Sequence, residues 1–198
     1  MAPRADVSEE RRKQILDAAV KVFSESGFDK TRMDDIVTES GLSKGALYWY
    51  FDSKDAIITA ILENIFEDEI YHLQALVDAP GSAADRLSQL TNSTIAEFER
   101  VAETLPITFE FYAMALRNDV VRDAIQGYFE AYLNILVPII EQGIQSGEFR
   151  ELEAFDAAVA LGALMEGTVL LWVIDPDRIK IDKHLQTGVQ ILMAGMLR

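Results

Sequence analysis

The sequence contains no cysteine and only two histidines in 198 residues. Without cysteine the chain can form no disulfide bond, no thiolate nucleophile and no cysteine-ligated metal centre. The two histidines, His72 and His184, fall in separate predicted helices, and the prominent serines and threonines lie where helices begin. We therefore expect no catalytic residue, no metal site and no cofactor, and a reducing compartment such as the cytoplasm.

The sequence also leads us to expect no secretory signal and no membrane span. The N-terminus is polar and leads directly into charged residues, so it lacks the apolar stretch of a secretory signal. The longest apolar stretch, residues 157–174, is shorter than the roughly 20 residues of a membrane span and contains Glu166. Asp156 and Asp175 flank it. We therefore expect no membrane partner.

Basic residues are scarce: 18 Lys and Arg face 33 Asp and Glu, for a net charge of −15. Such a balance argues against nucleic acid, because phosphate binding requires basic side chains. The distribution of charge along the chain changes this interpretation, because residues 1–54 carry nine basic and ten acidic side chains and are almost neutral. The acidic remainder would repel DNA from every other surface.

Apolar residues recur at spacings of three and four along the whole chain, which predicts an all-α fold of about nine helices. We expect a helix-turn-helix domain over residues 1–54 and a larger helical domain over residues 55–198. Ser8 is the expected N-cap of the first helix, and Ala79-Pro80-Gly81 is the clearest break. Later helices are expected near residues 83–103, after Pro106, and near 119–145, 153–174 and 182–197.

The residues between 31 and 51 indicate a helix-turn-helix. Thr31 begins a capping-box pattern, and the helix that follows ends at Ser40-Gly41. Only residues 40–42 separate it from a short helix capped by Ser43, so the two helices must cross steeply and the second must project. Ser53 caps the next helix, which is expected to run for about 24 residues and to connect the two domains.

The projecting helix, residues 43–51, has two distinct sides. At about 100° per residue, Leu47 and Phe51 face inward, whereas Gly45 and Trp49 lie opposite them. Gly45 allows a close backbone approach, and Trp49 can lie on base edges. An alternative is that the run of four aromatic residues is core, but four consecutive side chains cannot all face inward. Phosphate donors are then available from Lys44, Tyr48, Tyr50 and Lys54, together with the free amides at Ser43.

A resemblance to the TetR family of regulators is carried by Gly27-Phe28, Thr31, Ile36, the stretch Gly41-Leu42-Ser43-Lys44-Gly45-Ala46-Leu47-Tyr48-Trp49-Tyr50-Phe51, and Ser53-Lys54. It covers about residues 8–60, in order and with the expected spacing. The resemblance implies a dimeric, effector-released repressor that binds a double-stranded DNA operator. It also implies that residues 55–198 form the domain for effector binding and dimerisation. Carried onto this chain, it implies DNA contacts from Thr31, Arg32, Ser43, Lys44, Gly45, Tyr48, Trp49, Tyr50 and Lys54.

The middle helices are rich in aromatic residues and methionine, most of which are ordinary core. The resemblance implies that some of them line a cavity for a small apolar or amphipathic effector. Glu110 and Glu166 could be its polar anchors and would favour a cation, or they could be satisfied by Thr94, Thr168 or a tyrosine. The expected ligand residues are Phe66, Thr94, Phe98, Glu110, Phe111, Tyr112, Tyr128, Tyr132, Met165 and Glu166.

Residues 157–174 are apolar on nearly every side, so protein must cover them on all sides. Pairing with the last helix and with the symmetry mates of both would give a four-helix homodimer interface, as the resemblance also implies. Burial within one chain is the alternative. The expected interface residues are Leu161, Leu164, Thr168, Leu171, Leu185, Val189, Leu192 and Met196.

Two other functions are compatible with a helical chain of this kind. One is an adaptor that binds protein, and the other is an enzyme that binds a small molecule without DNA activity. Only the repressor predicts affinity for DNA that depends on Lys44 and Tyr48.

Overall fold

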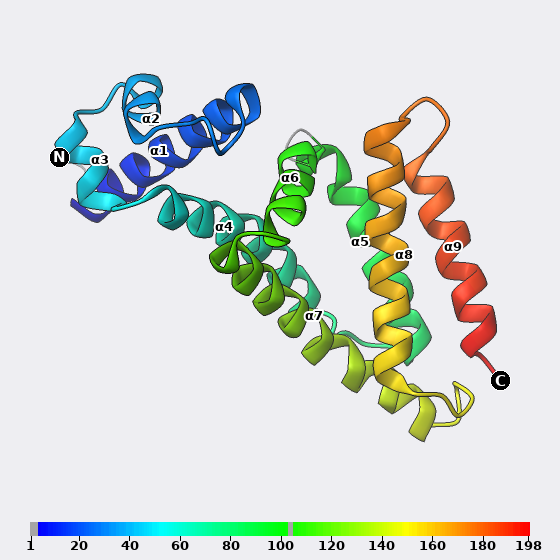
Figure 1. The fold of residues 1–198 in the computed structure, drawn as a ribbon. Coiled ribbons are helices and arrows are strands. Elements are labelled where there is room, and N and C mark those ends of the chain that lie inside the picture. The colour runs from blue at the N-terminus through cyan, green and yellow to red at the C-terminus, as the bar shows by residue number, and fades with distance from the viewer. Residues whose placement is uncertain (1–3, 103–104) are drawn as a thin grey trace. The chain divides into compact units, whose positions relative to one another are not determined.

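A computed structural model describes residues 4–102 and 105–198, and these residues form nine α-helices (Figure 1). The all-α fold expected from the apolar spacing is confirmed. In chain order the helices are α1 (Arg4–Ser26), α2 (Met33–Ser40), α3 (Lys44–Tyr50), α4 (Lys54–Gln74), α5 (Ala83–Val101), α6 (Leu105–Ala115), α7 (Asp119–Gln145), α8 (Ala154–Ile174) and α9 (Ile181–Met196).

The chain divides into two compact units. The first contains the residues up to Phe66 together with Glu110–Ile125, and the second contains Glu67–Phe109 together with Gln126–Arg198. Each of α4, α6 and α7 therefore contributes residues to both units. The boundary by contact lies within α4, while a division by function at residue 54 stays a prediction.

In the first unit, α1 packs against α2, and α3 follows α2 through a tight turn. The amide of Gln14 donates a hydrogen bond to the Ser40 carbonyl at 2.6 Å, and Lys21 pairs with Glu39 at 2.7 Å. Both contacts join α1 to the last turn of α2. Apolar side chains from all three helices fill the space between them, including Ile15, Ala19, Phe23, Ile36 and Leu47.

Two helix starts differ from the sequence expectation. Helix α1 begins at Arg4, upstream of Ser8, and the Ser8 hydroxyl instead accepts a hydrogen bond from the Tyr50 hydroxyl at 3.4 Å. The N-cap of α2 is Arg32, not Thr31. Gly27, at φ +75°, reverses the chain, and its carbonyl accepts the Thr31 hydroxyl at 2.8 Å. That contact removes the threonine side chain from the capping position.

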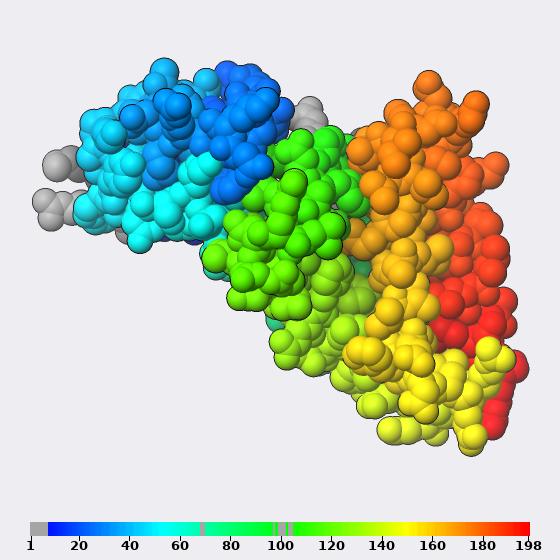
Figure 2. Space-filling model, in the orientation of Figure 1, coloured from blue at the N-terminus to red at the C-terminus, as the bar shows by residue number. Residues whose placement is uncertain are grey.

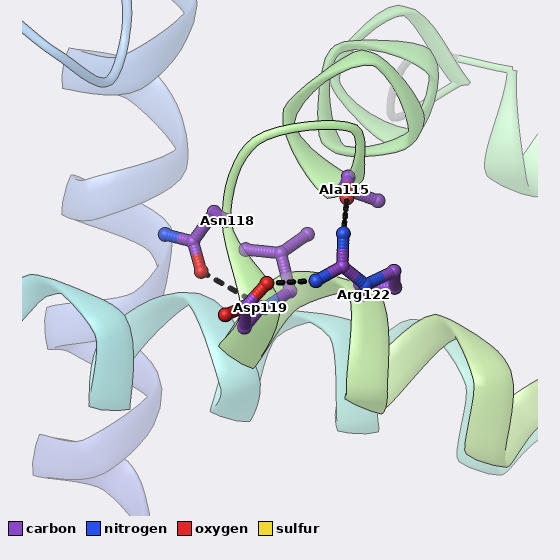
Figure 3. Close-up of polar contacts among 5 residues, drawn as sticks. Ala115, Asn118, Asp119 and Arg122 are labelled. Atoms are coloured by element: carbon purple, nitrogen blue, oxygen red, sulfur yellow. Dashed lines mark hydrogen bonds and ion pairs between the residues drawn. The ribbon is translucent and has the colours of Figure 1, made fainter.

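The turn between α6 and α7 is fastened by side chains within the first unit (Figure 3). The Asn118 carbonyl oxygen caps α7 by accepting from the Val121 amide at 3.2 Å. Arg122 donates to the Ala115 carbonyl at 3.3 Å and pairs with Asp119. The amide of Asn118 also donates to the Asp55 carboxylate at 3.2 Å, which ties this turn to the first turn of α4.

In the second unit, α5, α7, α8 and α9 enclose one apolar core, in which Leu87, Leu136 and Leu185 are completely buried. Helices α8 and α9 lie side by side (Figure 1). Helix α7 ends where Phe149 packs onto Gly143, so closely that a Cβ on this glycine would lie 2.4 Å from the ring. Any larger residue at position 143 would therefore clash with Phe149.

Helix α5 begins with two independent caps. Its N-cap residue Ser82 and Asp85 form a capping box, and the hydrogen bonds to Ser82 hold the pKa of the Asp85 carboxyl below its usual value. The carboxylate of Glu148, far along the chain, accepts hydrogen bonds from the Ala83 and Ala84 amides at 2.9 and 3.1 Å. A carboxylate at a helix N-terminus is stabilising because it meets free amides there.

Helix α8 has the length and composition of a membrane span, and it is the one such helix in the described ranges. Only 22% of its apolar window is buried in the single chain, and the remaining residues are half-buried or exposed. Figure 2 shows its outer surface, in yellow to orange, uncovered on the viewed face. The exposed large apolar residues of this helix are Phe155, Val159, Leu170, Leu171 and Ile174.

The expected dimer face requires a correction. Of its eight residues, five are buried inside the chain itself, because that side of α8 packs on α9 and on the core. Leu164 and Leu192 are half-buried, with Leu164 lying against Gly188, and only Leu171 is exposed. For part of the set, therefore, burial within one chain is the correct alternative. The five buried residues are Leu161, Thr168, Leu185, Val189 and Met196.

Candidate DNA-binding helix

Helix α3 is short, and both of its ends are defined by specific contacts. Gly41, at φ +67°, closes α2 with the left-handed conformation that glycine adopts most readily. The Ser43 hydroxyl then accepts a hydrogen bond from the Ala46 amide at 3.1 Å, so Ser43 is the N-cap of α3, as predicted. Leu47 and Phe51 are buried and anchor the helix from behind.

The opposite side of α3 faces outward. The Trp49 side chain is 75% exposed and that of Tyr48 is 44% exposed. Gly45 is also exposed, and apart from its chain neighbours and the backbone of its own helix no atom lies within 4 Å of the place where its Cβ would be. Tyr50 is half-buried and packs its ring edge-on against Trp49. The surface therefore offers two aromatic rings beside a stretch of bare backbone.

The lysines around this surface already have partners. Lys44 Nζ lies 2.6 Å from Asp34 Oδ1, and this hydrogen bond raises the pKa of Lys44 above its usual value. It also lies 5.9 Å from the centre of the Tyr48 ring. Lys54 Nζ donates to the Phe28 carbonyl at 2.8 Å and lies over that ring. Lys54 thus stabilises the first unit from within.

The other predicted DNA contacts lie in different surroundings. Arg32 and Ser43 are exposed beside the turn, where their side chains can be reached from outside. Thr31 is only 2% exposed, and its hydroxyl bonds to Gly27. The positions of these residues do not by themselves test any of the nine predicted contacts. They do distinguish the residues that face outward from those that support the helix.

The predicted ligand residues fall into both units. In the second unit, Phe98 and Trp172 stack edge-to-face with ring centres 4.7 Å apart. The Tyr132 ring packs on Gly162, whose Cβ would lie 3.1 Å from it. The Thr94 hydroxyl donates to the Leu90 carbonyl within its own helix. Tyr128 and Met165 are also buried in the second unit, and Glu166 is half-buried there. The other four predicted ligand residues belong to the first unit, where Phe66 and Phe111 are buried, Tyr112 is half-buried and Glu110 is exposed.

A hollow of about 480 Å³ lies along α7 and shares no residue with the predicted ligand set. Sequence reasoning missed it because polar and apolar side chains are interspersed on this side of α7, so no periodic signal marks it. Its lining consists of Gln126, Phe129, Glu130, Leu133, Asn134, Val137, Pro138 and Phe155.

Comparison with protein families identifies the chain. Residues 15–61 match the model of the bacterial regulatory proteins of the tetR family. Residues 73–194, more than half of the chain, match the model of the C-terminal domain of BetI-type transcriptional repressors. The chain belongs to the tetR family. This regulator is therefore a DNA-binding transcriptional repressor, and α3 is the second helix of its helix-turn-helix.

Curated relatives of the regulator have the same character. It is 30% identical to the HTH-type transcriptional regulator YfiR of Bacillus subtilis over 156 residues, which are 77% of this chain and 76% of the relative. It is 29% identical to the HTH-type transcriptional regulator TtgR of Pseudomonas putida, over 93% of this chain and 92% of the relative. Both relatives are transcriptional regulators rather than enzymes.

Solved structures show that the regulator shares its fold with proteins of several bacteria. A transcriptional regulator of Pseudomonas aeruginosa superposes with a TM-score of 0.84 at 23% identity, over 94% of this chain and 92% of the other. A regulator of Saccharomonospora viridis, solved with choline, gives 0.80 at 20% identity over 96% and 99%. FadR of Bacillus subtilis, solved with stearoyl-CoA, gives 0.78 at 24% identity over 92% and 98%.

Proposed function

We propose that this regulator acts in the cytoplasm as a homodimer, binds a palindromic operator, and is released by a small, largely apolar or amphipathic effector. The observation that carries the proposal is the outward surface of α3, where Trp49, Tyr48 and Gly45 are exposed while Leu47 and Phe51 hold the helix from behind. Rings that can lie on base edges and bare backbone that can approach phosphate are what a major groove accommodates.

The nine predicted DNA contacts have three different roles in this proposal. Lys44, Arg32 and the free amides at Ser43 bind phosphate, and Tyr48 adds a hydroxyl donor. Trp49 and Gly45 lie against base edges and the sugar-phosphate backbone. The roles of the remaining three follow from their internal contacts. Thr31, Tyr50 and Lys54 position α3 through Gly27, Ser8 and Phe28, respectively.

The proposed dimer face is the exposed side of α8. Phe155, Val159, Leu170 and Ile174 are spaced by four and eleven residues and so lie along one side of the helix. An apolar stripe of this length needs a partner, and a second copy provides a matching stripe through a twofold axis. Exposed Ile191 of α9 extends the face. Such a dimer would present two α3 helices about 34 Å apart, to successive major grooves.

The proposed effector site is in the second unit, among Thr94, Phe98, Tyr128, Tyr132, Met165 and Glu166. Apolar rings would hold the body of the ligand, and the half-buried Glu166 carboxylate would face its polar end. Choline and stearoyl-CoA in similar folds are ligands of those other proteins, and they support a fold that accommodates varied small molecules. Phe66, Glu110, Phe111 and Tyr112 are left out because they belong to the first unit.

Effector binding can weaken operator binding only if the effector binds more tightly to the conformation that has released the DNA. Helices α4, α6 and α7 run through both units, so a change in the second unit has three covalent routes to the first. A preference of about 1–3 kcal/mol, which is typical of allosteric coupling, would weaken operator binding roughly 5- to 150-fold.

The test begins with a duplex of about 30 bp, long enough for two half-sites one turn apart, selected from a random pool by binding to the wild-type protein. Lys44→Ala should weaken binding and make the dependence of log K on log salt shallower by about one ion. Tyr48→Ala should weaken binding by about 0.5–1.5 kcal/mol, the net contribution of one neutral hydrogen bond. The control is Tyr71→Ala, because Tyr71 is an exposed tyrosine of the second unit, 72% exposed against 44% for Tyr48. Failure of the wild-type protein to enrich any duplex would overturn the proposal.

A further inference from the structure

The acidic residues of α2 have different partners. The Asp35 carboxylate accepts a hydrogen bond from the Arg32 amide at 2.7 Å and so completes the start of α2. Asp34, its neighbour, instead reaches across to α3, where its carboxylate lies 2.6 Å from Lys44 Nζ. Both side chains of this pair are exposed, 65% for Asp34 and 61% for Lys44. The pair therefore lies at the surface where the two helices of the motif meet.

Lys44 is also the first residue of α3, next to Gly45 and one turn before Tyr48. A DNA phosphate that lies against the proposed reading face of α3 would meet its exposed ammonium group directly. In the isolated protein, however, the nearest anion to that group is the Asp34 carboxylate. The phosphate and the carboxylate would then compete for the same cation.

We propose that Asp34 competes with DNA phosphate for Lys44 and thereby lowers the affinity of this regulator for DNA of any sequence. The inference rests on the proposed reading face of α3. If Lys44 turns to the phosphate, the contact with Asp34 is lost. If Lys44 keeps both partners, a carboxylate remains within a few ångströms of the phosphate and repels it. Binding is weaker in either case than it would be with a neutral residue at position 34.

The size of the effect follows from counterion release. One additional phosphate contact on duplex DNA steepens the slope of log K against log salt by about 0.9. At a salt concentration of about 0.15 M, that slope corresponds to about a fivefold gain in affinity. Because the term is independent of base sequence, Asp34→Asn should tighten the selected duplex and a scrambled duplex by the same factor.

The experiment measures fluorescence anisotropy with both duplexes over a series of salt concentrations. Asp34→Asn is compared with Glu39→Gln, which removes one carboxylate from the same helix and releases Lys21 from an ion pair of 2.7 Å. Both variants change the net charge equally. Each is also combined with Lys44→Gln, which keeps a long polar side chain without charge. Thermal unfolding of each variant confirms that the fold is retained.

The expected result is about fivefold tighter binding and a steeper salt slope for Asp34→Asn, with less than about a twofold gain for Glu39→Gln. The gain from Asp34→Asn should disappear when Lys44 is glutamine. Equal gains for the two single variants, or a gain that persists without Lys44, would mean that Asp34 acts only through net charge and would overturn the inference. So would unchanged affinity in Asp34→Asn. If Lys44→Gln weakens DNA binding while Asp34→Asn leaves it unchanged, the proposed reading face is supported and only the competition by Asp34 is refuted. The experiment therefore distinguishes failure of this inference from failure of the proposed function.

Discussion

Gly45→Ala should separate the stability of this regulator from its affinity for DNA. Gly45 is the second residue of α3, it is exposed, and apart from its chain neighbours and the backbone of its own helix no atom lies within 4 Å of a Cβ built there. Alanine therefore fits the isolated protein without strain. It should raise the free energy of unfolding by at most about 0.5–1 kcal/mol, because alanine loses less backbone entropy than glycine in a helix.

The same methyl group should interfere with DNA. If the backbone at Gly45 lies close to the duplex, an added carbon overpacks that contact, and overpacking costs about 1–3 kcal/mol. At 1.4 kcal/mol per factor of ten, the dissociation constant should rise about 5- to 100-fold. The stability gain and the affinity loss thus have opposite signs. A general loss of folding would move both quantities in the unfavourable direction.

Urea unfolding and fluorescence anisotropy with the selected duplex would be measured on the same preparation, at one protein concentration because the proposed dimerisation would contribute to stability. Gly127→Ala in α7 is the matched control, since Gly127 is also exposed, helical and free of such atoms within 4 Å. It should stabilise the chain and leave DNA affinity unchanged. Unaltered or tighter DNA binding by Gly45→Ala would refute the close approach of α3 to DNA.

Two further predictions concern the second unit. Gly143→Ala should lower the free energy of unfolding by about 1–3 kcal/mol, because the new Cβ would lie 2.4 Å from Phe149 and 2.8 Å from Ala83; urea unfolding beside Gly127→Ala checks this, and a stabilised variant would contradict it. Val159→Asp should convert the proposed dimer to a monomer in analytical ultracentrifugation, with unchanged helicity by circular dichroism, because the proposed twofold axis would place both carboxylates in one apolar interface. Leu116→Asp, at an exposed leucine of the first unit, is its control, and a Val159→Asp variant that remains dimeric would exclude this face.

The arrangement of α3 could be predicted from the sequence because the information is local. Leu47 and Phe51 are one turn apart, so they share a side, and the intervening residues Tyr48 and Trp49 must point elsewhere. The caps at Ser43 and Ser53 were predictable for the same reason, since a hydroxyl reaches amides only two or three residues away. The structure places all of these residues as the spacing predicts.

Contacts between distant residues were not predictable. Thr31 matched a capping pattern, but a carbonyl four residues upstream takes its hydroxyl. Lys44 and Lys54 were both expected to bind phosphate, although one pairs with Asp34 and the other donates to Phe28. A sequence shows which residues carry charge, whereas the partner of each charge depends on how the helices cross.

The amino-acid sequence alone determined the all-α fold, the helix-turn-helix and the outward side of α3, because an amphipathic helix encodes its own inner face in the spacing of its apolar residues. The sequence of helix α8 has no such spacing. It is apolar nearly all round, so other protein segments could cover any of its sides. Only the packing of α8 on α9 decided that Leu161 and Met165 are core, and that Val159 and Ile174 are exposed in the single chain.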